Sequence, residues 1–140
     1  MRIVLDTNVV LSALLWRGTP YRLLEAIRQQ QHVQLVSSAA LVAELADVLT
    51  RPKTAKRLAV IEKSAREVLA DYLEAVELVE PTSVPRVVPT DPDDDHVIAA
   101  AVTANASLIV SGDSDLLSME SHQGMPIVTA AQALQAIEAT

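Results

Sequence analysis

The sequence predicts an α/β, three-layer fold, in which a central, mostly parallel sheet of four to five strands carries helices on both faces. Short apolar runs typical of buried strands alternate along the chain with longer segments whose apolar residues recur at helical spacing. Half of the 140 residues are hydrophobic, which supplies a core and argues against disorder. The chain has no internal repeat and no clear internal boundary, so one domain over residues 1–140 is expected.

Five apolar runs are short enough to be strands, and helical segments separate most of them. The expected strands are residues 2–5, 33–37, 76–79, 108–111 and 127–128. Because the connections between strands contain helices, the strands are expected to run mostly parallel.

The expected helices have recognisable ends. The residues Gly18-Thr19-Pro20 stop the first helix. Ser37 or Ser38 can cap the third helix, and Pro52 is expected to end it. The proline-rich residues 81–89 are expected to form an extended loop. The helices are expected at residues 9–16, 21–30, 39–49, 54–58, 61–75, 94–104 and 130–139.

Charge and composition restrict the classes of function. A net charge of −7 argues against a nucleic-acid partner, because phosphate binding usually needs a basic surface. The positive residues are concentrated in the first half, however, and only Arg86 follows Arg66. The absence of Cys excludes a disulfide framework, and no apolar segment approaches the length of a signal peptide core or a membrane span. A cytoplasmic protein that makes no membrane contact is expected.

Two acidic motifs directly follow expected strands. Asp6 follows Ile3-Val4-Leu5, and Asp113 and Asp115 follow Leu108-Ile109-Val110. Ligands of parallel sheets bind just beyond the carboxyl ends of the strands, so both motifs are expected at that edge. Asp6 could instead cap the following helix, and Asp is common in tight turns such as the one expected around Asp113.

Glu44 lies on an expected helix with an apolar stripe formed by Leu41, Leu45, Val48 and Leu49. At about 100° per residue, Glu44 falls on the border of this stripe, whereas Asp47 points roughly the opposite way. A carboxylate beside buried surface is costly unless it is paired or bound to a metal ion. Glu44 could therefore be a ligand, or it could reach solvent or pair with an Arg.

Three consecutive acids, Asp93, Asp94 and Asp95, open an apolar helix. One Asp at the N-cap and another in the first turn would complement the helix dipole, but three exceed that need. Asp93 is expected to cap, and Asp95 to belong to the buried helix. Asp94 remains an alternative to Asp95 as the functional acid.

Carboxylates that converge repel one another, and a divalent cation is the usual way to cancel the charge. Mg²⁺ prefers oxygen ligands, some of them supplied by water and substrate phosphates. The sequence offers no competing catalytic group, because it has no Cys nucleophile and His96 has no second His nearby for a zinc site.

A basic stretch offers the best site for phosphate contact, although such stretches are usually only solvated helix faces. The residues concerned are Arg51, Lys53, Lys56 and Arg57. Only Trp16, Tyr21 and Tyr72 could stack on bases, so a protein that reads single strands by stacking is not expected.

Four segments together resemble the PIN-domain nucleases, across nearly the whole chain. They are Val4-Leu5-Asp6-Thr7-Asn8, Glu44 in its helix, Asp95-His96-Val97-Ile98-Ala99-Ala100-Ala101, and Ile109-Val110-Ser111-Gly112-Asp113-Ser114-Asp115-Leu116-Leu117. The chain looks most like the VapC-like group, described as toxins of type II toxin–antitoxin pairs. The resemblance implies a single PIN-like domain and a ribonuclease dependent on Mg²⁺ or Mn²⁺. It also implies an RNA substrate, an antitoxin partner that blocks the site, and frequent homodimers.

Carried over by position, the resemblance implies a catalytic and metal-binding quartet of Asp6, Glu44, Asp95 and Asp113. Asp115 would be an accessory metal ligand. The supporting polar residues would be Thr7, Asn8, Ser111 and Asp94. In this hypothesis a metal-activated water attacks the phosphorus, and no side chain acts as nucleophile.

Two other classes of function compete with the nuclease. An aspartate-based phosphatase would have a second Asp two residues after Asp6, where this chain has Asn8, and a receiver domain would have a late Lys, whereas none follows Lys63. A catalytically inactive PIN-like module that binds RNA or protein also fits the sequence.

Overall fold

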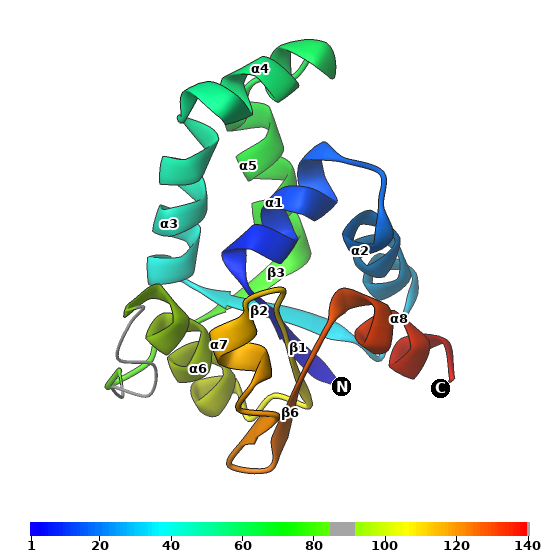
Figure 1. Ribbon diagram of the computed structural model, residues 1–140, viewed down its shortest axis with the longest axis vertical. Coiled ribbons are helices and arrows are strands. Elements are labelled where there is room, and N and C mark those ends of the chain that lie inside the picture. The colour runs from blue at the N-terminus through cyan, green and yellow to red at the C-terminus, as the bar shows by residue number, and fades with distance from the viewer. Residues whose placement is uncertain (85–91, 140) are drawn as a thin grey trace.

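A six-stranded sheet forms the centre of the computed structural model, which describes residues 1–84 and 92–139 (Figure 1). The strands are β1 (Arg2–Leu5), β2 (Gln34–Ser38), β3 (Val76–Val79), β4 (Leu108–Val110), β5 (Ser121–His122) and β6 (Met125–Val128). Their order is β3-β2-β1-β4-β6-β5, and every neighbouring pair is parallel except β5 and β6. The α/β prediction with a mostly parallel sheet is therefore confirmed.

The sheet has one strand more than the four to five expected. Ser121 and His122 of β5 pair with Pro126 and Met125 of β6 in an antiparallel hairpin. The two loop residues, Gln123 and Gly124, have φ values of 50° and 81°. Positive φ at both positions is the requirement of the type I′ turn that closes two-residue hairpins. β5 was missed because its two residues are polar and it is defined by this turn and its partner.

The described part of the chain has eight helices. They are α1 (Thr7–Leu15), α2 (Thr19–Gln29), α3 (Ala39–Leu49), α4 (Pro52–Val60), α5 (Ala65–Ala75), α6 (Pro92–Ala104), α7 (Ser114–Leu117) and α8 (Ala130–Glu138). In Figure 1, α2 and α8 lie side by side, while α3, α4 and α5 extend away from the sheet. No described helix combines the length and the hydrophobicity needed to cross a membrane.

Alternation along the strands creates two cores, one on each face of the sheet. Ile3 and Leu5 of β1 pack with residues of α1, α2, α3, α5 and α8. Val4 faces the other way and packs with residues of α6 and α7, such as Ile98 and Leu116. Because successive side chains of a strand point to opposite faces, one short apolar run contributes to both cores. The expected three layers are thus observed.

Helix ends explain where the predicted boundaries shift. Ser38, one of the two proposed caps, accepts a hydrogen bond from the Leu41 N–H at 3.3 Å. Pro52 does not end α3, which stops at Leu49, but opens α4, where its missing N–H costs nothing. α5 begins at Ala65 instead of residue 61, because Ser64 and Glu67 form a reciprocal capping box. Most of the expected loop over residues 81–89 lies outside the described residues.

The order of the strands creates a switch point between β1 and β4. From β1 the chain places β2 on one side, and much later it places β4 on the other side. Crevices form beyond the carboxyl ends of strands at such points, because the following connections diverge. Asp6 follows β1 and Ser111 follows β4, so the fold brings both of these residues to the switch point.

Candidate functional site

A chain of hydrogen bonds joins the ends of β1 and β4. The Ser111 hydroxyl donates to Oδ2 of Asp6 at 2.8 Å, and the same hydroxyl oxygen accepts from the Asp113 N–H at 2.9 Å. The backbone supports this arrangement, since the Asp6 N–H donates to the Val110 carbonyl at 2.9 Å. Asp6 is only 6 % exposed and Ser111 is buried. Two acids 107 positions apart in sequence are therefore linked through one hydroxyl.

The environment of Asp6 disfavours its charge. Burial raises the pKa of Asp6 above its usual value, and the nearby negative charge of Asp113 raises the pKa further. The Ser111 hydroxyl and the backbone N–H groups of Thr7 and Asn8 lower the pKa, but they do not cancel the effect of burial. Asp6 occupies the N-cap position of α1 without a side-chain capping bond to that helix. The side-chain partner of Asp6 is the Ser111 hydroxyl at the end of β4, outside this helix.

Asp113 has a capping role as well as its place beside Asp6. Its Oδ1 accepts a hydrogen bond from the Asp115 N–H at 2.7 Å, which starts α7 where the sequence suggested only a turn. Asp113 is partly buried, and Asp115, two residues later, is exposed. The structure therefore brings Asp113 to Asp6 and leaves the Asp115 side chain in solvent.

Asp94 and Asp95 lie in the first turn of α6, and both are almost fully buried, at 3 % and 1 % exposure. The Oδ2 atom of each is buried and accepts no hydrogen bond from the described residues, although each residue has other interactions. α6 packs against β1, β2 and β4, so these acids lie beside the sheet. Their burial does not distinguish Asp95 from its alternative, Asp94. The Asp93 side chain lies outside what the structure describes.

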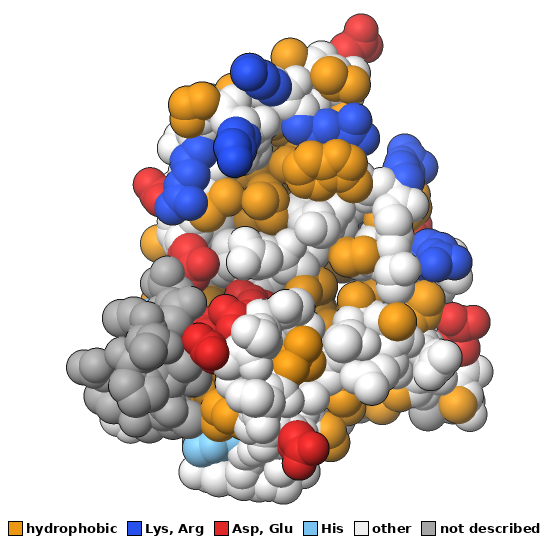
Figure 2. Space-filling model, viewed as in Figure 1, with side chains coloured by type: hydrophobic (Ala, Val, Ile, Leu, Met, Phe, Trp, Pro, Cys, Tyr) orange, Lys and Arg blue, Asp and Glu red, His pale blue; other side chains and the backbone are white. Residues whose placement is uncertain are grey.

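Glu44 is partly buried on α3, as its place on the border of the apolar stripe predicted. α3 contacts both α1 and α6. Asp47 is exposed and pairs with Arg51 at 3.1 Å, which agrees with its expected direction. Figure 2 shows acidic side chains gathered near the middle of one face, over the region between α3 and α7 in the same view of Figure 1.

A complete metal centre is not formed by the side chains as they stand. Within residues 1–84 and 92–139, no three His, Cys, Asp or Glu side chains are arranged closely enough to hold an ion. The structure joins Asp6, Ser111 and Asp113, whereas a common coordination sphere with Glu44 and Asp95 remains a prediction. The donors that do converge are oxygens, the type that Mg²⁺ and Mn²⁺ prefer, and a cation would relieve the repulsion between Asp6 and Asp113.

A groove of about 750 Å³ begins beside this site and runs along α1. It is lined by Asn8, Leu11, Trp16, Val48, Arg51, Pro52, Lys53 and Thr54. Two of the four predicted phosphate-binding residues, Arg51 and Lys53, are thus on its wall. Figure 2 shows hydrophobic side chains among Lys and Arg side chains over this upper part of the molecule. Sequence reasoning did not place Leu11 and Thr54 at a site, although Asn8 and Leu11 are one helical turn apart. It named Trp16 only as one of three aromatic residues, too few to suggest a protein that reads single strands by stacking.

The other two predicted basic residues differ from each other. Lys56 is exposed on α4. Arg57 donates from Nε to the Leu15 carbonyl at 2.7 Å, and its guanidinium lies 5.4 Å from the centre of the Trp16 ring. Arg57 therefore fixes the end of α1 and supports one ring face of Trp16.

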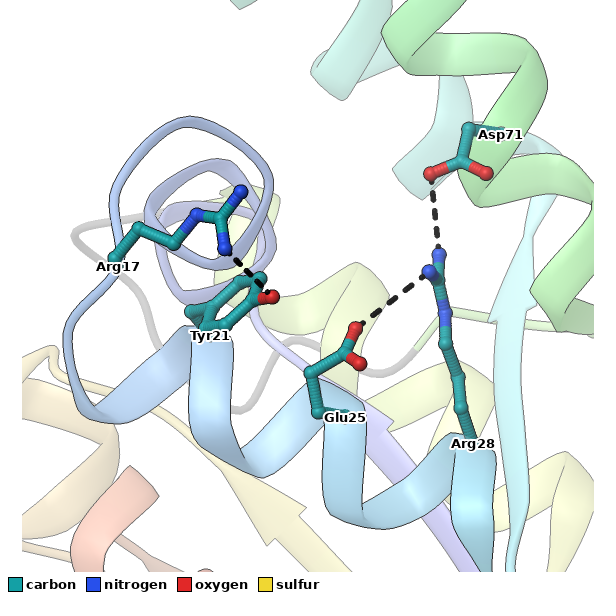
Figure 3. Close-up of polar contacts among 5 residues, drawn as sticks. All are labelled: Arg17, Tyr21, Glu25, Arg28 and Asp71. Atoms are coloured by element: carbon teal, nitrogen blue, oxygen red, sulfur yellow. Dashed lines mark hydrogen bonds and ion pairs between the residues drawn. The ribbon is translucent and has the colours of Figure 1, made fainter.

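A second charged cluster lies on α2 and α5, away from the acidic site. Arg28 pairs with Glu25 at 3.8 Å and with Asp71 at 3.3 Å, and Arg17 donates to the Tyr21 hydroxyl at 3.0 Å (Figure 3). These side chains are at least partly exposed, and such pairs contribute little to stability. Because they lie outside the acidic site, substitutions in this cluster can serve as controls for substitutions at the acids.

The fold and the residues at the switch point agree with the comparison with known proteins. A family model described as PIN domain matches residues 2–115, which include every acid discussed above. The chain belongs to the PIN-domain family, a family of nucleases.

Among solved structures, the chain is similar to one from the crystal structure of VapBC2 from Rickettsia felis bound to a DNA fragment from their promoter. The TM-score is 0.65 at 14 % sequence identity, and the match covers 92 % of this chain and 98 % of the other. At this identity the likeness establishes the fold. No curated protein matches the sequence significantly.

Proposed function

We propose that this protein is an endoribonuclease that uses a divalent metal ion, Mg²⁺ or Mn²⁺, to hydrolyse phosphodiester bonds of RNA. One observation carries the proposal: in a PIN domain, the Ser111 hydroxyl joins the buried Asp6 to the end of β4, where Asp113 lies beside it. This arrangement concentrates negative charge that a cation would neutralise.

In the proposed site, Asp6 and Asp113 would hold the ion directly, with Glu44, Asp95 and Asp115 as further ligands. When bound, the ion supplies an activated water and stabilises the charge that develops on the phosphate. Ser111 keeps Oδ2 of Asp6 in place and favours the charged form of this carboxylate. Thr7 and Asn8 present backbone N–H groups to Asp6, and Asp94 would add to the negative field from α6.

The proposed RNA path follows the groove, where Arg51 and Lys53 would contact phosphates, with Lys56 and Arg57 nearby. Positive side chains along one wall offset the net charge of −7, which otherwise opposes RNA binding. This placement explains how an acidic protein can act on a polyanion.

The test is cleavage of mixed RNAs by the purified protein with Mg²⁺ and with EDTA. Asp6→Asn should reduce cleavage at least 100-fold, because it removes a charged ligand that the ion needs. Asp71→Asn is the matched control, since it makes the same change in an exposed carboxylate that pairs only with Arg28 among the contacts described (Figure 3). Full activity of Asp6→Asn, or equal cleavage in EDTA, contradicts the proposal. RNA binding without cleavage would identify a binding module instead.

We also propose that the protein is the toxin of a toxin–antitoxin pair, and that an antitoxin covers this site. The support is the fold shared with a chain of a VapBC2 complex. Expression of the protein alone should stop bacterial growth, whereas expression of Asp6→Asn should not. Homodimer formation is a further part of the proposal, to be measured by light scattering. Normal growth with active, soluble enzyme present would remove the toxin assignment and leave the nuclease.

A further inference from the structure

Trp16 is the one tryptophan of the sequence, and it lies 45 % exposed at the end of the groove. A large indole ring is normally more buried than this, because burial of its apolar area is favourable. The ring follows the last turn of α1, which begins immediately after Asp6. The same helix therefore carries the proposed catalytic carboxylate at one end and an exposed aromatic ring at the other.

The ring is also held in position. Arg57 is fixed by its hydrogen bond to the Leu15 carbonyl, and its guanidinium lies over the Trp16 ring. A cation over one face of an indole is attracted to it and restricts its orientation. A rigid aromatic ring loses little entropy when a second planar group stacks on it, which is a property of good binding residues.

The distance between the acidic site and Trp16 suits a single-stranded nucleic acid. Asn8 and Trp16 are eight residues apart, which corresponds to about 12 Å along a helix axis at 1.5 Å per residue. Stacked nucleotides of one strand rise about 3.4 Å each, so this length spans a few nucleotides. Arg51 and Lys53 line the same groove as Asn8 and Trp16 and complement the phosphates that would pass there.

From this placement we infer that Trp16 is a base-stacking platform: a base of single-stranded RNA, a few nucleotides from the scissile phosphate, stacks on its indole ring. The inference rests on the proposed ribonuclease function and adds the subsite that fixes the register of the strand. Base stacking tolerates every base, so Trp16 would favour unpaired RNA over duplex without reading a sequence. RNA is the occupant proposed because the two charged residues on the groove wall, Arg51 and Lys53, are positive and complement a chain of phosphates.

Because the chain has a single tryptophan, tryptophan fluorescence, excited selectively over that of the two tyrosines, reports on this ring alone. The wild-type protein in EDTA, where the proposed cleavage does not proceed, is titrated with a short single-stranded RNA. A second titration uses a chain of the same length with the ribose-phosphate backbone but no bases. The RNA should quench the fluorescence saturably, and the abasic chain should not. Binding of RNA without any change in fluorescence overturns the inference.

Substitution provides the second measurement. By anisotropy of labelled RNA, Trp16→Ala should weaken binding about 5- to 150-fold, the range for loss of one base stack. Trp16→Phe keeps a ring and should recover most of the affinity. Leu78→Ala is the control, because Leu78, on β3 and outside the groove, is exposed to a similar extent, 51 % against 45 % for Trp16. In Mg²⁺, Trp16→Ala should raise KM and leave kcat within about twofold.

The outcomes separate the two proposals. Two results would overturn the stacking platform and leave the nuclease, provided that the wild type cleaves RNA. One is the absence of quenching, and the other is equal RNA affinity of Trp16→Ala and Leu78→Ala. Quenching without cleavage keeps the platform and removes the nuclease. If Trp16→Ala converts a dimer to a monomer, the groove is an interface between two copies and the inference is wrong. Thermal unfolding of each variant checks that it is folded. The fluorescence titration of the wild type tests stacking on Trp16 without relying on any variant.

Discussion

At the scale of single residues, Ser111 is the side chain on which the geometry of the site depends. Its one hydroxyl donates to Asp6 and accepts from the Asp113 N–H, so it relates the two acids and does not itself need to touch a substrate. It is therefore a positioning residue. Because it is buried, removal of its hydroxyl leaves buried polar partners without that hydrogen bond, which is costly.

Ser111→Ala should lower activity about 10- to 100-fold, the usual effect of removing a partner that orients a metal ligand. The Ser111 hydroxyl lowers the pKa of Asp6, so its removal raises that pKa. Because the charged form of Asp6 is the one that binds a cation, the acidic limb of the pH–activity profile should move to higher pH. Ser83→Ala removes an exposed hydroxyl outside any helix and should leave the profile unchanged. An unshifted profile in Ser111→Ala would contradict the positioning role.

Tyr72 gives a pH prediction for stability. Burial raises its pKa to about 12, and a hydrogen bond with Ser37 only partly opposes this. The folded pKa is above the unfolded value of 10.0, so the contribution of Tyr72 is fully present below pH 10 and is lost as the pH rises toward 12. The loss is roughly 3 kcal/mol for a two-unit shift. Urea unfolding between pH 8 and pH 11 should show about half of this decline in the wild type, because pH 11 lies midway between the two pKa values, and a weaker decline in Tyr72→Phe.

At the scale of elements, caps decide where several helices begin. The Ser64 hydroxyl accepts from the Glu67 N–H at 3.1 Å, and the Glu67 carboxylate accepts from the Ser64 N–H at 3.3 Å. This pair starts α5 four residues later than the apolar pattern suggested, since periodicity continues through residues 61–64 but a reciprocal cap satisfies the first N–H groups.

Ser64→Ala should therefore reduce the free energy of unfolding by about 1 kcal/mol through loss of the cap. Ser83→Ala, at an exposed position outside any helix, is the matched control and should change it by less than about 0.5 kcal/mol. Denaturant titration monitored by circular dichroism measures both. Equal stability of Ser64→Ala and the wild type would mean that the cap observed in the structure does not contribute.

At the scale of the whole molecule, the switch point concentrates charge that the fold tolerates poorly. Asp94 and Asp95 are buried beside the sheet, and Asp6 and Asp113 repel each other across the ends of β1 and β4. A cation that binds the folded state and not the unfolded chain stabilises the protein by mass action.

Added Mg²⁺ or Mn²⁺ should therefore raise Tm in a concentration-dependent manner. The gain is about 2.7 kcal/mol when the ion is at 100 times its Kd. Asp113→Asn should abolish most of this gain, because it removes one of the two repelling carboxylates, while Asp71→Asn should retain it. A melting temperature that is unaffected by the ion would argue against a metal site, whatever the activity of the protein.

The sequence determined the local parts of this protein. Apolar runs such as Ile3-Val4-Leu5 and Leu108-Ile109-Val110 predicted strands, and the acids after them predicted the edge where Asp6 and Asp113 meet. Both kinds of inference succeed because hydrophobic periodicity and turn chemistry act over a few residues.

Tertiary structure decided what depends on pairing between distant segments. β1 lies beside β4, and Ser111 therefore reaches Asp6 over 105 positions. The tertiary structure also buries both Asp94 and Asp95 and forms β5 by pairing it with β6. It places Trp16 against Arg57 beside a groove. These features follow from how helices and strands pack. Packing depends on contacts between segments that are far apart in the sequence, so short-range patterns do not predict it.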